Sequence, residues 1–146
     1  AVFAGSYKVL PINGAFFTPD TAIVNVSGVT TVDFTVTPFL RVDATATTVS
    51  GGVVLKYKIS RSAASGKIME RKAVAFQSDK VSSTVFNAQV TTNLSAIPDE
   101  DILDTEFTDT ITGLESGKTY YVRVAAKTNN SNNKYNYSEI IQITVP

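Results

Sequence analysis

The stretch at residues 112–127 constrains the fold of this chain more than any other part of the sequence. It places two glycines in a short polar corner, and after them apolar or aromatic residues recur at every second position. Successive side chains of a β-strand point to opposite faces, so this run predicts a strand with one apolar face. The residues of that face are Tyr120, Val122, Val124 and Ala126. Leu114, ahead of the corner, is expected to pack over the same core as Tyr120.

The spacing of Leu114, Gly117 and Tyr120 is typical of a tyrosine corner, which closes one end of a Greek-key β-sandwich. The pattern Leu-x-x-Gly-x-x-Tyr-x-Val-x-Val-x-Ala resembles the fibronectin type III family of immunoglobulin-like domains, and the match is strongest over residues 105–145. The resemblance implies an all-β fold, a Greek-key β-sandwich, and the surplus residues ahead of the family pattern predict additional N-terminal strands. It implies no particular activity, because such sandwiches serve many unrelated functions.

The composition excludes several classes of function. Basic and acidic residues number 13 each, so the net charge is zero and gives no electrostatic reason to expect a nucleic acid as partner. The absence of Cys and His excludes disulfides, thiolate or imidazole metal ligands and His-based catalysis. No apolar run is long enough for membrane insertion. Abundant Thr and Val favour strands, because β-branched side chains pack well on a pleated surface.

Charged residues make up only 18% of the chain, below the roughly 25% of a typical globular domain. Two interpretations stay open. Part of the surface is buried against another molecule, or the sandwich is covered mainly by Thr and Ser. The start at Ala1 is likewise expected either of a mature form after signal cleavage or of an excised domain. We expect a secreted protein that is extracellular or located at the cell surface.

Alternating apolar and polar residues predict further strands along the chain, and no stretch predicts a helix. The expected strands cover residues 21–26, 29–37, 40–47, 53–60, 67–76, 81–91, 107–111, 120–126 and 135–145. By the family resemblance, the stretches 29–37, 40–47 and 53–60 correspond to strands A, B and C. Residues 67–76 begin with polar side chains on both faces, which predicts an edge strand protected by charge.

The N-terminal segment is surplus to a sandwich of this type, which needs about 100 residues. We expect residues 29–146 to form the sandwich and residues 1–28 to be an extension with extra strands. One interpretation is an edge strand that packs on its own domain. The other is strand donation, in which the segment pairs with a sheet edge of the next copy and a head-to-tail contact builds a filament. The candidate assembly residues are Tyr7, Val9, Phe16 and Phe17.

The main concentration of carboxylates runs from Asp99 to Asp109. Asp99, Asp101 and Asp104 are candidate Ca²⁺ ligands, because this hard cation prefers carboxylate and carbonyl oxygens. Their spacing lacks the regular alternation of a calcium-binding loop. A solvated acidic loop is therefore the alternative.

An Asn-rich loop precedes the last expected strand. Asn side chains both donate and accept hydrogen bonds, and a neighbouring Tyr offers a flat ring, so the loop is a candidate for contact with a glycan or a protein partner. Ordinary turn and strand roles are the alternative. The candidate binding residues are Asn129, Asn130, Asn132, Asn133 and Tyr135.

These observations predict a protein that is not an enzyme, with no catalytic residue and no cofactor other than the Ca²⁺ considered above. We expect an extracellular structural or adhesive β-sandwich protein, a filament (pilus-like) subunit that assembles through its N-terminal strand. The first alternative is a carbohydrate-binding accessory module of a secreted enzyme, and the second is a virion-surface decoration domain. The expected partners are other copies of the chain, or a surface protein or glycan, with no nucleic acid and no membrane insertion.

Overall fold

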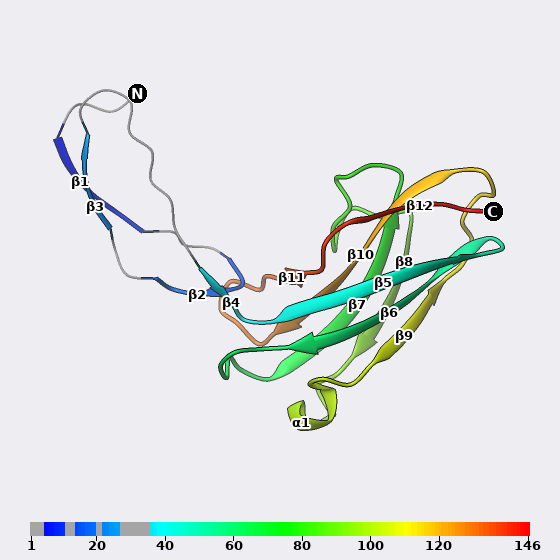
Figure 1. Ribbon diagram of the computed structural model, residues 1–146. Coiled ribbons are helices and arrows are strands. Elements are labelled where there is room, and N and C mark those ends of the chain that lie inside the picture. The colour runs from blue at the N-terminus through cyan, green and yellow to red at the C-terminus, as the bar shows by residue number, and fades with distance from the viewer. Residues whose placement is uncertain (1–4, 11–13, 20–21, 27–35) are drawn as a thin grey trace.

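The computed structural model describes residues 5–10, 14–19, 22–26 and 36–146. Its main body is a sandwich of two antiparallel sheets (Figure 1). The three-stranded sheet has the order β5-β6-β9 and contains β5 (Arg41–Val49), β6 (Gly52–Ser60) and β9 (Phe107–Ile111). The five-stranded sheet has the order β11-β10-β7-β8, and β12 also pairs with β10. Its strands are β7 (Ile68–Phe76), β8 (Ala88–Asn93), β10 (Thr119–Thr128), β11 (Asn136–Tyr137) and β12 (Ile141–Thr144).

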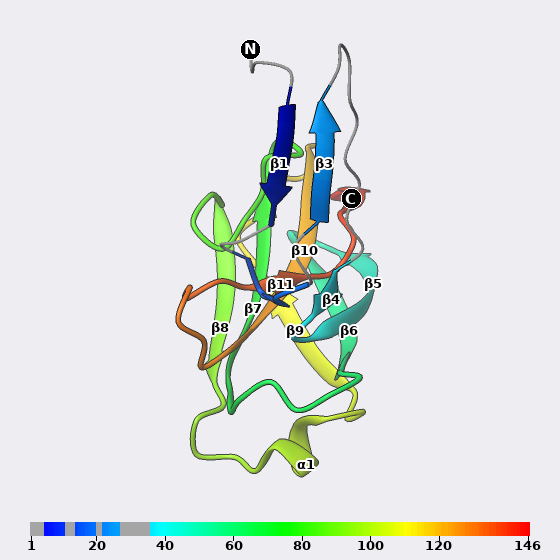
Figure 2. The ribbon, with the colours of Figure 1, turned by 90° about the vertical axis from the view of Figure 1, so that its left-hand side faces the viewer.

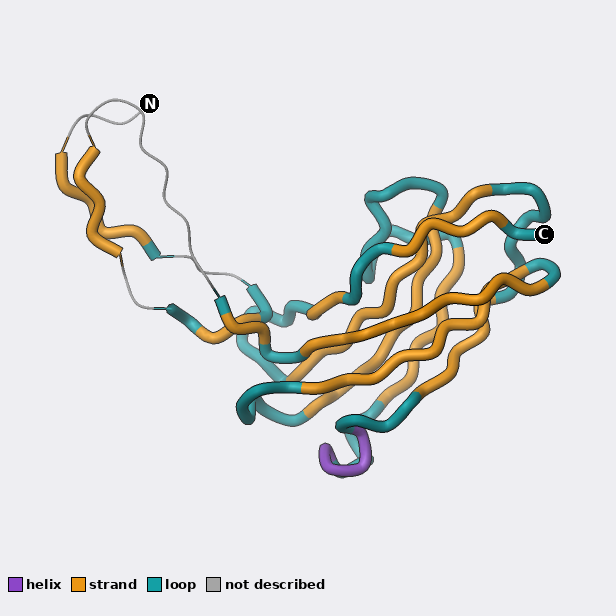
Figure 3. The backbone as a smooth tube through the Cα atoms, viewed as in Figure 1, coloured by secondary structure: helices purple, strands orange, loops and turns teal. Residues whose placement is uncertain are grey.

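The core lies between these two sheets and follows the predicted alternation. On β10 the predicted apolar face is buried, and on β6 every second side chain from Val53 to Ile59 is buried opposite it. Apolar burial of this extent is the main favourable contribution to folding. The predicted all-β sandwich is therefore confirmed. Figure 3 shows how fully strands dominate the chain. Within the described residues, no helix has the length and apolar character needed to cross a membrane.

The corner between β9 and β10 is formed as the sequence predicts. Leu114 and Tyr120 are both buried, at 6% and 3% exposure. The Glu115 N–H donates a hydrogen bond of 3.1 Å to the Tyr120 hydroxyl, which ties the corner to the strand that follows it. Gly117 has a φ of +79°, a conformation that favours glycine, and its N–H donates to the Val145 carbonyl at 2.8 Å.

The position of β7 in the sheet differs from the predicted one. It lies between β10 and β8, so the predicted edge strand is an interior one. Its charged side chains are accommodated because Arg71 points inward to a buried carboxylate, while Glu70 and Lys72 have the opposite parity and lie on the outer surface. Charge on both faces of a strand is therefore compatible with an interior position when each face supplies partners.

Three further elements differ from the sequence-based expectation. Within the expected strand at residues 81–91, only the last part is extended, as β8. The acidic stretch contains a one-turn helix, α1 (Asp99–Ile102), whose apolar Ile102 is fully buried and anchors the turn. The expected final strand is interrupted between β11 and β12, where the Ser138 side chain is buried and accepts a hydrogen bond from the Val124 N–H at 2.9 Å.

In the described part of residues 1–38, four short strands lie outside the two main sheets. β1 (Gly5–Val9) pairs with β3 (Ala22–Val26), and β2 (Phe16–Phe17) pairs with β4 (Thr37–Pro38). The β1–β3 pair projects away from the sandwich in both Figure 1 and Figure 2, whereas β2 lies against it. The predicted strand at residues 21–26 is confirmed as β3. The one predicted at residues 29–37 falls almost wholly outside the described residues.

Candidate functional site

The candidate site lies on the outer face of the five-stranded sheet. Antiparallel register places Glu70 of β7 opposite Lys127 of β10 on one side and opposite Asn93 of β8 on the other. Two residues along, Lys72 is opposite Ala125 and Thr91. Residues two positions apart on a strand share one face of the sheet. Polar and charged side chains of the neighbouring strands β8, β7 and β10 therefore lie together on the outer face.

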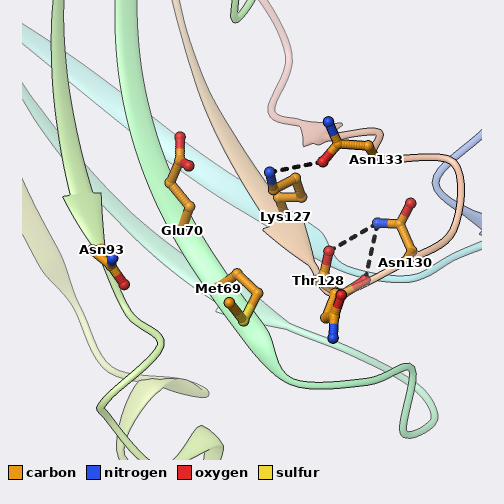
Figure 4. Close-up of a pocket in the computed structure, with 8 residues that line it drawn as sticks. Met69, Glu70, Asn93, Lys127, Thr128, Asn130 and Asn133 are labelled. Carbon is orange, nitrogen blue, oxygen red and sulfur yellow. Dashed lines mark hydrogen bonds between the residues drawn. The ribbon is translucent and has the colours of Figure 1, made fainter.

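The Asn-rich loop between β10 and β11 closes one end of this face. Asn130 braces the loop internally: its Nδ2 donates to the Thr128 carbonyl at 2.9 Å and to the Lys134 carbonyl at 3.2 Å, and its Oδ1 accepts from the Lys134 N–H. Asn133, with φ +51°, accepts a hydrogen bond of 2.9 Å from the Lys127 ammonium, as Figure 4 shows. The loop therefore presents an ordered polar edge.

Two tyrosines after the loop complete the face. The Tyr135 hydroxyl donates a hydrogen bond of 2.7 Å to Glu70 Oε1, and the Lys127 ammonium lies 5.3 Å from the Tyr135 ring centre. The Tyr137 hydroxyl donates to Ser83 Oγ at 3.0 Å, and the Arg123 guanidinium lies 4.1 Å from the ring centre of Tyr137. Burial and the hydrogen bond to Glu70 raise the pKa of Tyr135, so its phenol stays protonated. Both rings are thereby held in fixed orientations, with their centres 6.3 Å apart.

Two hollows on this surface meet at the Lys127–Asn133 contact. The first hollow has a volume of about 180 Å³ and is drawn in Figure 4. It is lined by Met69, Glu70, Asn93, Lys127, Thr128, Asn129, Asn130 and Asn133. The second hollow has a volume of about 470 Å³, within the roughly 300–1,000 Å³ of small-molecule sites. It is lined by Lys72, Ser82, Ser83, Thr84, Lys127, Asn133, Lys134, Tyr135 and Tyr137.

The predicted binding residues divide between these hollows and a neighbouring contact. Asn129, Asn130 and Asn133 line the first hollow, and Asn133 and Tyr135 line the second. Asn132 instead donates to the Gly14 carbonyl at 3.3 Å, so it contacts the N-terminal segment.

Sequence reasoning did not identify the strand residues that complete the site. These are Glu70, Lys72 and Lys127, to which the Ser82–Thr84 turn is added. The polar character of both faces at the start of residues 67–76 was the available signal, and it was interpreted as an edge strand.

The three predicted Ca²⁺ ligands, Asp99, Asp101 and Asp104, differ in their surroundings. Asp99 forms ion pairs with Lys67 at 2.9 Å and Arg61 at 3.4 Å, and it accepts the Ile68 N–H at 3.1 Å. Burial alone would raise the pKa of Asp99, but the hydrogen bonds from Lys67 and Ile68 outweigh it and hold the pKa below its usual value. Asp101 and Asp104 are exposed. Among the described residues, no three acidic side chains gather in a way that could hold a metal ion. Binding of Ca²⁺ by these aspartates stays a prediction.

The predicted assembly residues occupy two different strand pairs. Tyr7 and Val9 lie in β1, in register with Val24 and Ala22 of β3. Phe16 and Phe17 form β2 and are both half-buried. The Phe17 ring packs edge-on against the Phe39 ring, with ring centres 5.1 Å apart. Phe17 is therefore partly covered by a residue of the same chain.

A buried polar cluster lies between the sheets and is distinct from the outer site. The Tyr57 hydroxyl donates to Asp109 Oδ2 at 2.5 Å, and Arg71 Nη1 lies 2.7 Å from Asp109 Oδ1 and 2.6 Å from the Tyr57 hydroxyl. Burial and the hydrogen bond to Asp109 raise the pKa of Tyr57. The Arg71 guanidinium also stacks 4.5 Å from the ring centre of Phe107. This cluster connects the two sheets and is a structural feature.

Comparison with known proteins finds similar folds among solved structures. No protein-family model matches the chain, and no curated protein matches it. A solved DUF3823 family protein from Bacteroides ovatus is 23% identical, with a TM-score of 0.77 over 100% of this chain and 78% of its own. Another, from Bacteroides uniformis, is 19% identical, with a TM-score of 0.78 over 99% and 76%.

A further solved structure is a protein from Bacteroides uniformis described as a "putative carbohydrate binding protein". It is 23% identical, with a TM-score of 0.77 over 99% of this chain and 75% of its own. At these identities the likeness shows a shared β-rich fold, and the similarity extends over the N-terminal segment as well as the sandwich.

Proposed function

We propose that this protein is a non-catalytic carbohydrate-binding β-sandwich and that the outer face of its five-stranded sheet is the binding surface. The observation that carries the proposal is the meeting of two polar hollows at Lys127 and Asn133, beside the ring of Tyr135. A saccharide presents many hydroxyls together with flat patches of C–H groups. A surface that combines amides, hydroxyls and ammonium groups with a tyrosine ring is complementary to both.

The order of the surface supports this proposal. Asn130 is held by hydrogen bonds within its own loop, and Lys127 is held by Asn133. Tyr135 is fixed by Glu70. Side chains that are already oriented lose less conformational entropy when a ligand binds, which favours affinity. The structurally similar protein described as a "putative carbohydrate binding protein" is consistent with the same class of function.

The family resemblance also belongs to this proposal. We infer a fibronectin type III-like sandwich, supported by the tyrosine corner and by the division of the strands between the sheets. In such folds strand C lies in the same sheet as strands F and G. Here the strand beside β10 is β7, whereas β6 lies in the other sheet, so the expected equivalence of residues 53–60 with strand C is corrected to strand B. The shift arises because, among the described residues, the first strand of the two main sheets is β5.

A glycan array and titration calorimetry with Tyr135→Ala test the proposed function. We expect the wild type to retain at least one glycan, and Tyr135→Ala to lose at least tenfold in affinity for it, about 1.4 kcal/mol. Tyr121→Ala is the matched control, because Tyr121 is a half-buried tyrosine of β10 that lines neither hollow. Absence of wild-type binding to every glycan, or equal binding by Tyr135→Ala, would contradict the proposal.

A second candidate function is assembly through the N-terminal segment, as a filament subunit or an adhesive protein. Among the described strands, β1 and β3 pair only with each other, so each has one edge free of a described partner. Such edges favour addition of a strand from another chain.

A further inference from the structure

The second hollow carries a local excess of positive charge. Three lysines line it, Lys72, Lys127 and Lys134, and none of the described residues that line it carries a carboxylate. The chain as a whole has no net charge, so this concentration of positive charge is local. We propose that the second hollow binds the anionic group of an acidic saccharide, a carboxylate or a sulfate ester, while the first hollow binds the neighbouring sugar hydroxyls. This inference rests on the proposed function and specifies its ligand class.

The lysines of the hollow have donors to spare. Lys72 donates to the Ser83 carbonyl at 2.7 Å, and Lys127 donates to Asn133 Oδ1 at 2.9 Å. An ammonium group has three donors, so each side chain retains others for a ligand. Among the described residues, the ion pairs formed with carboxylates involve Arg61, Lys67 and Arg71 and none of these three lysines.

Glu70 is the cross-strand neighbour of Lys127, but the ion pairs among the described residues do not include one between these two side chains. Its carboxylate accepts the Tyr135 hydroxyl and lines the first hollow, on the other side of the Lys127–Asn133 contact. Lys127 lines both hollows, whereas Lys72 and Lys134 line the second alone, so the side of the surface away from Glu70 is the more basic one. A ligand with a charged group at one end and neutral hydroxyls at the other is complementary to this division.

The hydroxyls of the turn at Ser82–Thr84 add to the anion site. These three residues line the hollow beside Lys72, and the Ser83 hydroxyl already accepts a hydrogen bond from Tyr137. Hydroxyl and ammonium donors together match the several acceptor oxygens of a carboxylate or a sulfate. Tyr137 positions this turn because its hydroxyl also accepts the Ser83 N–H at 3.1 Å.

Calorimetry with matched saccharide pairs tests the inference. The probes are oligogalacturonate against its methyl ester, and dextran sulfate against dextran, each at low and high salt. We expect at least one acidic member to bind tenfold or more tightly than its neutral counterpart, with an advantage that shrinks as salt rises. The pair that shows the advantage identifies whether carboxylate or sulfate is the preferred group.

Substitutions localise the effect. Lys72→Gln combined with Lys134→Gln should lower the acidic-to-neutral affinity ratio at least tenfold, whereas Lys58→Gln, an exposed lysine on the opposite sheet, should leave it unchanged. Circular dichroism and urea unfolding confirm that each variant is folded. Equal binding of acidic and neutral members overturns the acidic-ligand inference and leaves the carbohydrate proposal standing. Absence of binding to all four probes and to a glycan array overturns both, and inorganic sulfate binding as tightly as dextran sulfate overturns a saccharide ligand for this hollow.

Discussion

The cluster of Tyr57, Arg71 and Asp109 shows how charged residues are accommodated inside this sandwich. Its members come from β6, β7 and β9, and hence from both sheets. The side chains of Arg71 and Asp109 are only 14% and 6% exposed. Burying an ion pair costs desolvation energy, which the attraction between the charges offsets only when geometry is good and further hydrogen bonds are made. The Tyr57 hydroxyl, within 2.6 Å of either partner, supplies those hydrogen bonds.

This arrangement predicts a large effect of removing one partner. Asp109→Asn should lower the free energy of unfolding by about 3 kcal/mol, because the Arg71 charge is then buried without compensation. Urea unfolding of the purified variant measures the loss. The double variant Arg71→Met with Asp109→Leu is the control, and we expect it to be more stable than Asp109→Asn, since no uncompensated charge remains. A single variant within about 0.5 kcal/mol of the wild type would contradict this account.

Among the elements, α1 shows how a single acidic side chain secures a short helix to the sandwich. A one-turn helix has too few internal hydrogen bonds to be stable alone. Asp99, its first residue, reaches the Ile68 N–H at the start of β7 and the flanking Lys67 and Arg61. Ile102, at the other end, is buried in the core. The helix is thus held by one polar and one apolar anchor.

The Asp99 contacts predict a specific dependence of stability on pH. The pKa of Asp99 is lower in the folded state than its ordinary value of 3.8, so the unfolded chain takes up the proton first as pH falls. The contribution of Asp99 is therefore fully present above that ordinary value and is lost as pH falls through the lower, folded pKa.

The urea midpoint, followed from pH 7 down to about pH 2, measures this dependence. We expect it to fall less steeply in the acidic range for Asp99→Asn than for the wild type. Asp101→Asn, which removes an exposed carboxylate from the same turn, is the charge-matched control. Parallel curves for the wild type and Asp99→Asn would refute the role of this side chain.

At the scale of the whole molecule, the described part of the N-terminal segment combines a docked part with a projecting part. The docked part is held by Asn136, which donates to the Ala15 carbonyl at 2.7 Å and accepts the Leu40 N–H at 3.0 Å. Ala15 itself is buried. Within the described residues the projecting β1–β3 pair consists of two strands, and an isolated two-stranded sheet is marginally stable in water. Its stability is therefore expected to depend on further contacts.

Deletion of residues 1–10 tests whether another copy of the chain supplies those contacts. If the strands of this pair mediate assembly, the wild type forms larger particles at high concentration and the shortened protein stays monomeric with an intact sandwich. Light scattering and negative-stain microscopy measure particle size, and circular dichroism checks the fold. Ile140→Ser, which removes an exposed apolar side chain from the sandwich, is the control and should assemble like the wild type. A monomeric wild type at high concentration would count against assembly through this segment.

The all-β class and most of the strands were determined by sequence alone, because alternate burial has a period of two residues and is legible locally. The corner at Leu114, Gly117 and Tyr120 is equally local, since its hydrogen bond joins residues five positions apart. The interior position of β7 was not legible in this way. Polar residues on both faces of a strand are compatible with an edge position and with an interior one. The choice depends on which strands pair with it.

Tertiary structure alone decided the candidate site and the buried cluster. The sequence pointed to the Asn-rich loop, but the Glu70 partner of Tyr135 lies 65 residues away, and the Asp109 partner of Tyr57 lies 52 residues away. Such pairs depend on which strands become neighbours and in what register, and a shift of one residue would move every side chain to the opposite face. Local patterns thus determined the scaffold, whereas long-range pairing placed the lysines, tyrosines and Asn-rich loop on one surface.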